Sequence, residues 1–297
     1  AFRYRGRMGL AYTALIGGVA AQLAIPRLLG EAIDELLLLD SAEKGLIVTL
    51  GLIILSVFAL RGILEFVRLY YSESISQRVA YDLRNSLYDT YQRLSFAYHD
   101  SEHTGNLMSK ATADVDGVRR FISMGLVRSA DIILLVTLTC TLMFLLNPPL
   151  ALISLSFVPF LALRSSLVVR KLRGLWLGVQ VLMGEMVTVL QENLSGMKVV
   201  KSFASEEYEK GRFARKTHEL AEQGYLADKA EGANSAIMTF FFTLVTGFIL
   251  WYGGRQGING HITTGELVQF IAYMSVLQLP IRMTAFTVNT FSRAISS

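Results

Sequence analysis

The sequence predicts an all-α membrane protein with six transmembrane helices and long helical extensions on the cytoplasmic side. Of the 297 residues, 52% are hydrophobic and only 18% are charged, whereas soluble proteins carry about 25% charged residues. Six stretches have the length and apolar character that a bilayer-spanning helix needs, about 20 residues each. The basic residues gather in the segments that lie on one side of these stretches.

The predicted spans cover residues 10–29, 45–68, 126–146, 150–169, 233–253 and 266–288. The fifth is the clearest because it contains no charged residue. Asn147, Pro148 and Pro149 predict a tight turn between the third and fourth spans, since proline cannot continue a helix. The alternative, that these stretches are buried helices of a soluble bundle, is disfavoured by their number and length.

The distribution of lysine and arginine predicts the orientation of the spans. The N-terminal tail and the two long connecting segments, residues 69–125 and 170–232, together hold 19 of the 28 basic residues. The loops on the other side hold Lys44 and Arg255. We therefore expect both termini and both long segments in the cytoplasm.

The two long segments, called here the first arm (69–125) and the second arm (170–232), contain no proline and have helical periodicity. In the first arm, Ile75, Val79, Leu83 and Leu87 recur every fourth residue. The second arm carries a longer apolar row: Leu175, Val179, Leu182, Met186, Leu190, Leu194 and Met197. Each arm is predicted to be a helical hairpin that extends roughly 37 Å beyond the bilayer. The alternative is a solvated coiled hairpin with no specific role.

Each arm reverses direction at a tip that combines an aromatic residue, small residues and charge. In the first tip, residues 96–105, we expect Gly105 to supply a turn or cap and Thr104 to cap the following helix. The second tip lies within residues 195–207. Tyr98 and Phe203 are the aromatic residues expected to be exposed, a composition typical of a docking surface.

Four motifs taken together resemble the transmembrane domain of exporter-type ABC transporters, in the bacterial lipid and multidrug flippase group. They occur in the family's order and cover nearly the whole chain. The motifs are Tyr4-Arg5-Gly6-Arg7, then Phe96-x-Tyr98-x-Asp100-x-x-x-Thr104-Gly105-x-Leu107-x-Ser109, then Ser195-Gly196-x-x-Val199-Val200-Lys201-x-Phe203-x-x-Glu206, and finally Trp251-Tyr252-Gly253-Gly254 with Gly260-x-Ile262-Thr263-x-Gly265-Glu266-Leu267-x-x-Phe270-x-x-Tyr273.

The resemblance implies a bacterial inner-membrane dimer of two such halves, identical or related, that moves a lipid, drug or similar amphiphile by ATP-driven alternating access. The arms would end in coupling helices that dock on nucleotide-binding domains. Membrane lipids are further expected partners, and nucleic acid is not. The residues that match the coupling regions are Tyr98, His99, Asp100, Thr104, Gly105, Lys201, Phe203, Ala204, Ser205 and Glu206.

The chain contains no phosphate-binding loop of the pattern G-x-x-x-x-G-K-[ST]. We therefore expect no ATPase or other catalytic site and no cofactor on this chain, with ATP and Mg²⁺ on the nucleotide-binding domains. Because the chain ends at Ser297, soon after the sixth predicted span, we expect these domains on the same polypeptide, with a separate subunit as the alternative. A function of a different class is a non-transporting membrane scaffold or regulator whose arms dock a partner protein. An intramembrane enzyme would need a catalytic set that the sequence does not offer.

His99 and His103 lie four residues apart, a spacing that superficially resembles the H-E-x-x-H zinc motif. Asp100 stands where that motif has glutamate, and no third ligand is evident. We therefore expect a polar docking tip and no metal site.

Charged residues inside predicted spans are candidate residues of a substrate cavity, because burying a charge in a membrane is costly. The alternative is that they anchor the cytoplasmic ends of their spans at the membrane interface. Glu65 and Asp131 are spaced to pair within their own helices with Arg61 and Arg128, respectively. Arg282 has no such partner in its helix, so it is the first candidate for a residue that attracts anions, followed by Arg128 and Arg61.

Overall fold

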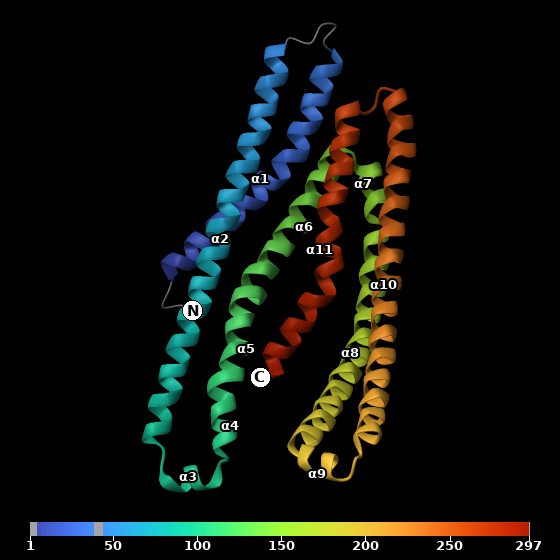
Figure 1. The fold of residues 1–297 in the computed structure, drawn as a ribbon. Helices are drawn as coiled ribbons and strands as arrows, with labels where there is room; N and C mark the ends of the chain where they lie inside the picture. Colours follow the sequence, from blue (N-terminus) through green and yellow to red (C-terminus); the bar gives the residue numbers. More distant parts are fainter. Residues whose placement is uncertain (1–4, 39–43, 297) are drawn as a thin grey trace. The chain divides into compact units, whose positions relative to one another are not determined.

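A computed structural model describes residues 5–38 and 44–296, and within this part of the chain it contains helices and short turns but no strand (Figure 1). The α-helices are α1 (Arg5–Leu38), α2 (Lys44–Arg93), α3 (Phe96–Ser101), α4 (Thr104–Ser109), α5 (Val115–Arg120), α6 (Val127–Leu146), α7 (Pro148–Leu155), α8 (Phe157–Ser195), α9 (Met197–Ser202), α10 (Glu206–Ile258) and α11 (Thr264–Ser296). Two π-helical turns, η2 (Lys110–Asp114) and η3 (Phe121–Leu126), join α4, α5 and α6 into one continuous helical run.

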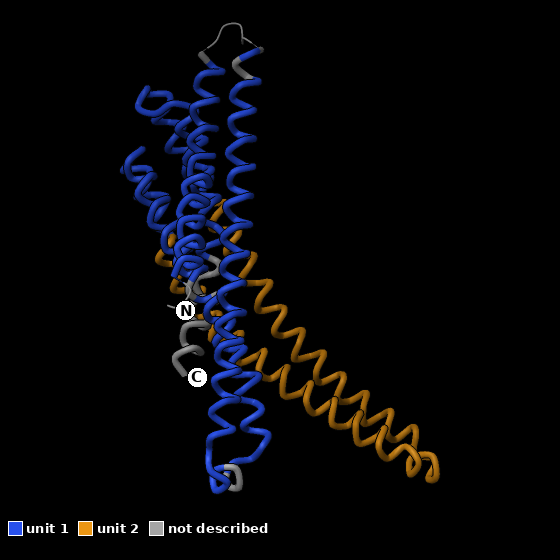
Figure 2. The backbone as a smooth tube through the Cα atoms, turned by 90° about the vertical axis from the view of Figure 1, so that its left-hand side faces the viewer, with its two compact units in different colours: residues 1–157, 245–297 blue, residues 158–244 orange. Residues whose placement is uncertain are grey.

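The helices form two compact units, which Figure 2 distinguishes by colour. Unit 1 contains residues 1–157 and 245–297, and unit 2 contains residues 158–244. In unit 1, α1 packs against α2, α6 and α11. Unit 2 is the hairpin of α8 and α10 with the short helix α9 at its turn (Figure 1).

Five helical stretches of the described chain are long and apolar enough to cross a membrane. They are Arg5–Leu37, Val48–Arg93, Thr104–Leu146, Pro148–Ser195 and Glu206–Ile258. Each overlaps one of the first five predicted spans, of which only the second, 45–68, begins before its stretch does. The sixth, residues 266–288, lies on α11 and runs into positions whose side chains are outside the described residues. The count of six spans therefore stays a prediction.

Small residues let α1 approach its neighbours closely, as is common between membrane helices. Ala11, Ala14 and Ala21 are buried on α1. A Cβ added at Gly17 would lie 3.2 Å from the side chain of Leu64 on α2. This close packing holds α1 along the membrane part of α2.

The turn between α6 and α7 is built as its sequence predicts. The side chain of Asn147 accepts a hydrogen bond of 3.0 Å from the backbone N–H of Leu150 and caps α7. Pro148 takes the first position of the helix, where a missing N–H costs nothing. The Asn147 amide also donates to Gln256 on α10 at 2.8 Å, which ties this turn to the end of α10 within unit 1.

The apolar row predicted for the second arm is correct at its start and wrong toward the tip. Val189 is buried, whereas Leu190 is 42% exposed and Leu194 is 61% exposed. The reason is geometric, because steps of four residues drift around a helix of 3.6 residues per turn. The hairpin instead follows alternating steps of three and four, which bring Val189 rather than Leu190 against α10.

Candidate coupling tips and charged span residues

The first tip is the six-residue helix α3, which has one extended residue before it and two after it. Ser95 precedes it, and Glu102 and His103 follow it, all with extended backbone. The Tyr98 carbonyl accepts a bond of 3.0 Å from the Glu102 N–H, which closes the short helix. Two predictions for this tip are wrong. His103, rather than Thr104, takes the cap position of α4, and Gly105 lies inside α4 rather than in a turn.

The exposed aromatic residue of the first tip is Phe96, with 89% of its surface accessible. The sequence predicts that Tyr98 is the exposed aromatic residue of this tip, but Tyr98 is half-buried. A helix of six residues has too few turns to reveal its buried face by periodicity, so the sequence offered no signal to separate the two rings. The side chains of His99 and Asp100 lie outside the described residues.

The geometry separates the two histidines of the zinc-like spacing. His99 lies on α3, while His103 lies in the extended segment before α4. The two residues are therefore not on one helix. Within the described chain, no group of three His, Cys, Asp or Glu side chains could hold a metal ion.

The second tip brings Lys201, Phe203, Ala204, Ser205 and Glu206 together in one turn between α9 and α10. The Ser205 N–H donates to the Val200 carbonyl at 3.0 Å, and the Ala204 N–H donates to the Lys201 carbonyl at 3.4 Å. This pair of bonds is a Schellman motif, whose central residue adopts a left-handed backbone that usually selects glycine. Ala204 takes that place with φ of 46°. The turn leaves the Phe203 ring 76% exposed, as the sequence predicts.

Charge fixes the first turn of α10 at this tip. Lys201 Nζ donates to Glu206 Oε1 at 2.9 Å, and this hydrogen bond lowers the pKa of Glu206. Glu206, Glu207 and Glu209 all lie in the first turn of α10, where negative charge is favoured by the helix dipole.

Ion pairs between helices stiffen both arms. In the first arm, Arg84 pairs with Asp116 at 2.8 Å and Arg119 with Glu73 at 3.1 Å. The second arm has equivalent links between α8 and α10: Glu192–Arg212 at 2.7 Å and Glu185–Lys216 at 2.9 Å. These pairs are exposed or partly exposed, so water screens them and each contributes little to stability. Their spacing along the hairpins keeps the paired helices in register.

One charged residue of the predicted spans, Glu65, pairs differently from the prediction. Glu65 is bound by Arg68 through two hydrogen bonds rather than by Arg61. The buried Arg68 also lies 3.6 Å from Asp131, which joins α2 to α6. Arg68 is thus a central charge. It was recognised from the sequence as a charged residue of the second span but was not chosen as a candidate site residue, although its spacing of three residues from Glu65 was a usable signal.

Of the three candidate cavity residues, Arg61 on α2 and Arg128 on α6 both lie within electrostatic reach of Asp131. Arg61 is half-buried and Arg128 is exposed, each on its own helix of unit 1. The side chain of Arg282 lies outside the described residues. Their role in substrate binding therefore stays a prediction.

Comparison with known proteins connects this architecture to one family. Residues 8–281 match the family model of the ABC transporter transmembrane region. The chain belongs to this family. The match covers both arms and both tips, so the helical hairpins described above are part of the family's transmembrane region.

Relatives of the chain carry names from the same family. The uncharacterized ABC transporter ATP-binding protein YknU of Bacillus subtilis is 32% identical over 99% of this chain and half of its own length. An ATP-dependent lipid A-core flippase of Syntrophus aciditrophicus is 28% identical over 95% of this chain and 46% of its own. A putative multidrug export ATP-binding/permease protein of Bacillus subtilis, YgaD, is 26% identical over 96% of this chain and half of its own. The chain thus spans about half the length of the curated relatives it matches.

Proposed function

We propose that this ABC transporter transmembrane region is the membrane half of an ATP-driven exporter or flippase that moves an amphiphile, such as a lipid or drug, by alternating access. In this proposal α3 and α9 are the coupling helices. One observation carries the proposal: each of these six-residue helices sits at the end of a helical hairpin whose long helices contain predicted membrane spans. The names of the lipid flippase and multidrug export relatives support the choice of an amphiphilic substrate.

The second arm has the mechanical properties that coupling requires. α10 runs without proline for 53 residues from the tip into the predicted span 233–253. At 1.5 Å per residue, 53 residues correspond to about 80 Å of unbroken helix. A rigid helix of this kind transmits a rotation of its tip to its far end without bending.

The remaining parts of the proposal follow from charge and from the family. The basic arms and both termini lie on the cytoplasmic side of a bacterial inner membrane, in accord with the preference of lysine and arginine for that side. Nucleotide-binding domains dock on the tips and bind ATP and Mg²⁺. Because the curated relatives are about twice as long as the matched segment, these domains are expected on the same polypeptide.

An exposed apolar row on α8 supports pairing with a second transmembrane half. The row lies beyond the predicted span 150–169, so lipid does not cover it. Its spacing of seven, four, three and four residues is that of a coiled-coil seam. Its members are Trp176, Met183, Val187, Leu190 and Leu194, each at least 41% exposed. Such a seam in water favours a partner helix, which a second copy or a related subunit would supply.

The decisive experiment removes the exposed ring of each tip in the full-length protein. Phe96→Ala and Phe203→Ala are expected to abolish the stimulation of ATPase activity by amphiphiles and ATP-driven transport in proteoliposomes, while the protein still assembles. Tyr225→Ala is the matched control, because Tyr225 is 64% exposed on the same α10 but lies about 28 Å along the helix from the second tip. It should leave stimulation unchanged.

Stimulation equal to wild type in both tip variants would overturn the assignment of α3 and α9 as coupling helices. An assembled protein that no amphiphile stimulates, and that transports none, would favour the scaffold alternative.

A further inference from the structure

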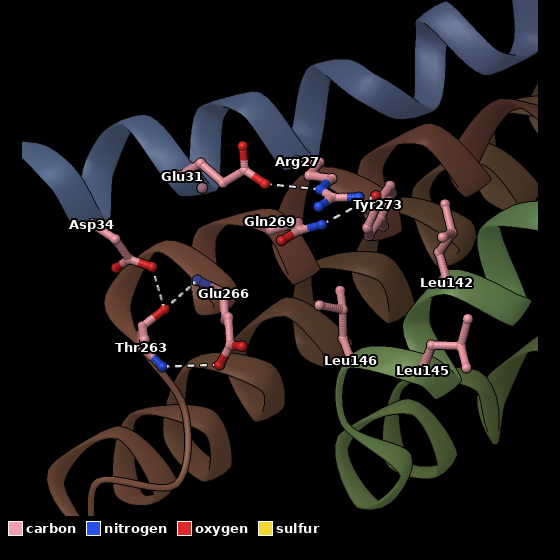
Figure 3. Close-up of a pocket in the computed structure, with 11 residues that line it drawn as sticks. Arg27, Glu31, Asp34, Leu142, Leu145, Leu146, Thr263, Glu266, Gln269 and Tyr273 are labelled. Carbon is pink, nitrogen blue, oxygen red and sulfur yellow. Dashed lines mark hydrogen bonds and ion pairs between the residues drawn. The ribbon is translucent and has the colours of Figure 1, made fainter. Parts of the chain in front are cut away.

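A pocket of about 410 Å³ lies in unit 1, where the end of α1, the end of α6 and the start of α11 meet (Figure 3). One wall comes from the end of α1 and the start of α11, and it is polar. The opposite wall comes from the end of α6 and consists of Leu142, Leu145 and Leu146. Pockets of this volume hold small molecules or molecular fragments.

The polar wall is built on a rigid junction between α1 and α11. The N–H of Gly265 donates to Asp34 Oδ1 at 2.7 Å, and the Thr263 hydroxyl donates to Asp34 Oδ2. Thr263 and Glu266 form a reciprocal capping box, with both bonds at 3.0 Å. A Cβ added at Gly30 would lie 2.7 Å from the Gly265 carbonyl oxygen, so the two backbones are in direct contact. We call these five residues the α1–α11 junction.

Deeper in the pocket, Gln269 and Tyr273 continue the polar wall. Gln269 Nε2 donates to the Tyr273 hydroxyl at 3.1 Å, and that hydroxyl donates to the Leu23 carbonyl at 3.2 Å. Both side chains are buried. These bonds fix the floor of the pocket before any ligand arrives.

The polar wall presents unused groups of both charges. Arg27 Nε donates to Glu31 Oε1 at 2.8 Å. The two terminal nitrogens of Arg27 have no hydrogen-bond partner among the described residues. Glu31 Oε2 and Glu266 Oε1 are likewise without a partner in the described chain. Arg27 and Glu31 are 70% and 55% exposed, so both are open to a ligand. One cation faces three carboxylates here, a balance that favours a ligand group with positive charge.

The level of the pocket in the membrane narrows the class of ligand. Arg27 stands near the end of the predicted span 10–29, Leu146 ends the span 126–146, and Glu266 begins the span 266–288. The polar wall therefore lies at the depth of lipid headgroups, with leucines facing it. Leu145 is 75% exposed, so the apolar wall is open on the side where acyl chains lie.

We propose that this pocket binds a zwitterionic phospholipid with a primary ammonium headgroup. Arg27 takes the phosphate through its terminal nitrogens, Glu31 and Glu266 take the ammonium, and an acyl chain lies along Leu142 and Leu145. With the arms in the cytoplasm, this lipid belongs to the outer leaflet. The site goes beyond the proposed transport function, because binding at this depth requires neither ATP nor movement of the lipid.

The test is native mass spectrometry of the full-length protein, without ATP, with three lipids that share their acyl chains: phosphatidylethanolamine, phosphatidylcholine and phosphatidylglycerol. Wild type should retain phosphatidylethanolamine most tightly, and Arg27→Gln and Glu31→Gln should each weaken it about tenfold, the loss of one charge-assisted contact. Arg255→Gln, which removes a positive charge from the exposed end of α10 outside the pocket, is the matched control and should bind as wild type does.

Two further measurements test the proposal. The double variant Arg27→Glu/Glu31→Arg retains an ion pair for folding but exchanges the charges, so it should also lose the headgroup preference. Soluble glycerophosphoethanolamine, which lacks acyl chains, should bind far more weakly than the lipid. Equal binding of phosphatidylglycerol and phosphatidylethanolamine by wild type, or loss in the two variants no larger than in Arg255→Gln, would overturn the proposal. Equal binding of the soluble headgroup would overturn the part given to the leucines.

Discussion

α10 is flanked by two turns of the same kind. One precedes it in the second tip, and the other follows it, just before the α1–α11 junction. Both turns are Schellman motifs. At the tip, Ser205 N–H bonds the Val200 carbonyl at 3.0 Å, and in the other turn His261 N–H bonds the Gln256 carbonyl at 2.9 Å. The left-handed position holds Ala204 in the first turn and Gly260 in the second, with φ of 46° and 73°.

The surroundings of the two turns differ. Gln256 in the turn after α10 accepts a bond from the distant Asn147. The turn leads into the capping box of Thr263 and Glu266, where Asp34 binds Thr263 and Gly265. Among the described residues, the tip turn is held by bonds within a few residues, such as Lys201–Glu206. The turn after α10 is therefore fixed by tertiary contacts and serves packing. The other keeps its Phe203 ring exposed, as a docking surface requires.

The largest effect is expected from Gly265→Ala, which tests whether the junction is fixed by backbone contact. A Cβ at this position would overlap the carbonyl oxygen of Gly30 and the Asp34 carboxylate. Because backbone cannot yield as a side chain can, we expect a loss of about 3 kcal/mol of stability. The measurement is the apparent Tm of the purified full-length protein. Gly254→Ala, with nothing within 4 Å of the added Cβ, is the control and should leave the Tm equal or slightly higher.

Asp34→Ala is expected to have the next largest effect, because it removes the acceptor of the Gly265 N–H and of the Thr263 hydroxyl. Gly265 is buried, so leaving its N–H unpaired should cost about 2 kcal/mol, whereas the exposed Thr263 hydroxyl can bond water instead. Asp34→Asn keeps an acceptor oxygen for Gly265 and should lose less. If Asp34→Ala and Asp34→Asn unfold at the wild-type temperature, tertiary contacts do not fix this turn.

These differences mark what could be predicted from the sequence. Hydropathy and periodicity were sufficient for the long helices, because a span and an amphipathic arm each repeat one pattern over many residues. The same reasoning failed over short distances: it placed Leu190 in the interior of the second arm, and it assigned the turn of the first tip to Gly105.

The junction residues and the pocket could not be predicted, because they depend on contacts between distant segments. Asp34 and Gly265 are more than 200 residues apart, and no local pattern links them. The T-x-x-E pattern of Thr263 and Glu266 was readable as a capping box, but not its bond to α1. Ala204 was named as a tip residue through family resemblance. Its left-handed backbone could not be predicted, because that conformation is usually indicated by a glycine and this position holds alanine.

A reciprocal pair of substitutions tests the left-handed positions themselves. Ala204→Gly relieves a conformation that costs a residue with a Cβ about 1 kcal/mol, and Gly260→Ala introduces that cost. We expect the first to stabilise the tip turn by about 1 kcal/mol, measured as slower hydrogen exchange of the Ser205 amide. The second should destabilise the whole protein by about 1 kcal/mol, measured as a lower Tm. The contrast would fail if Ala204→Gly raised exchange at the tip, since the turn would then not depend on the left-handed residue.

The smallest effect is expected from a change of pH, which acts on the Lys201–Glu206 ion pair that closes the tip turn. The direction of this effect follows from the pKa of Glu206. Hydrogen bonding to Lys201 lowers the pKa of Glu206, so the pair stabilises the tip at pH values above the ordinary carboxyl pKa of about 4.3. This contribution should be lost as the pH falls from there through the lowered pKa of Glu206, because protonation removes the charge that Lys201 binds. Hydrogen exchange of the first-turn amides of α10, corrected for its intrinsic pH dependence, should report the loss. Glu206→Gln should abolish this pH dependence, whereas Glu207→Gln, beside it in the same turn, should retain it. If Glu206→Gln retained the dependence, a group other than this pair would be controlling the tip.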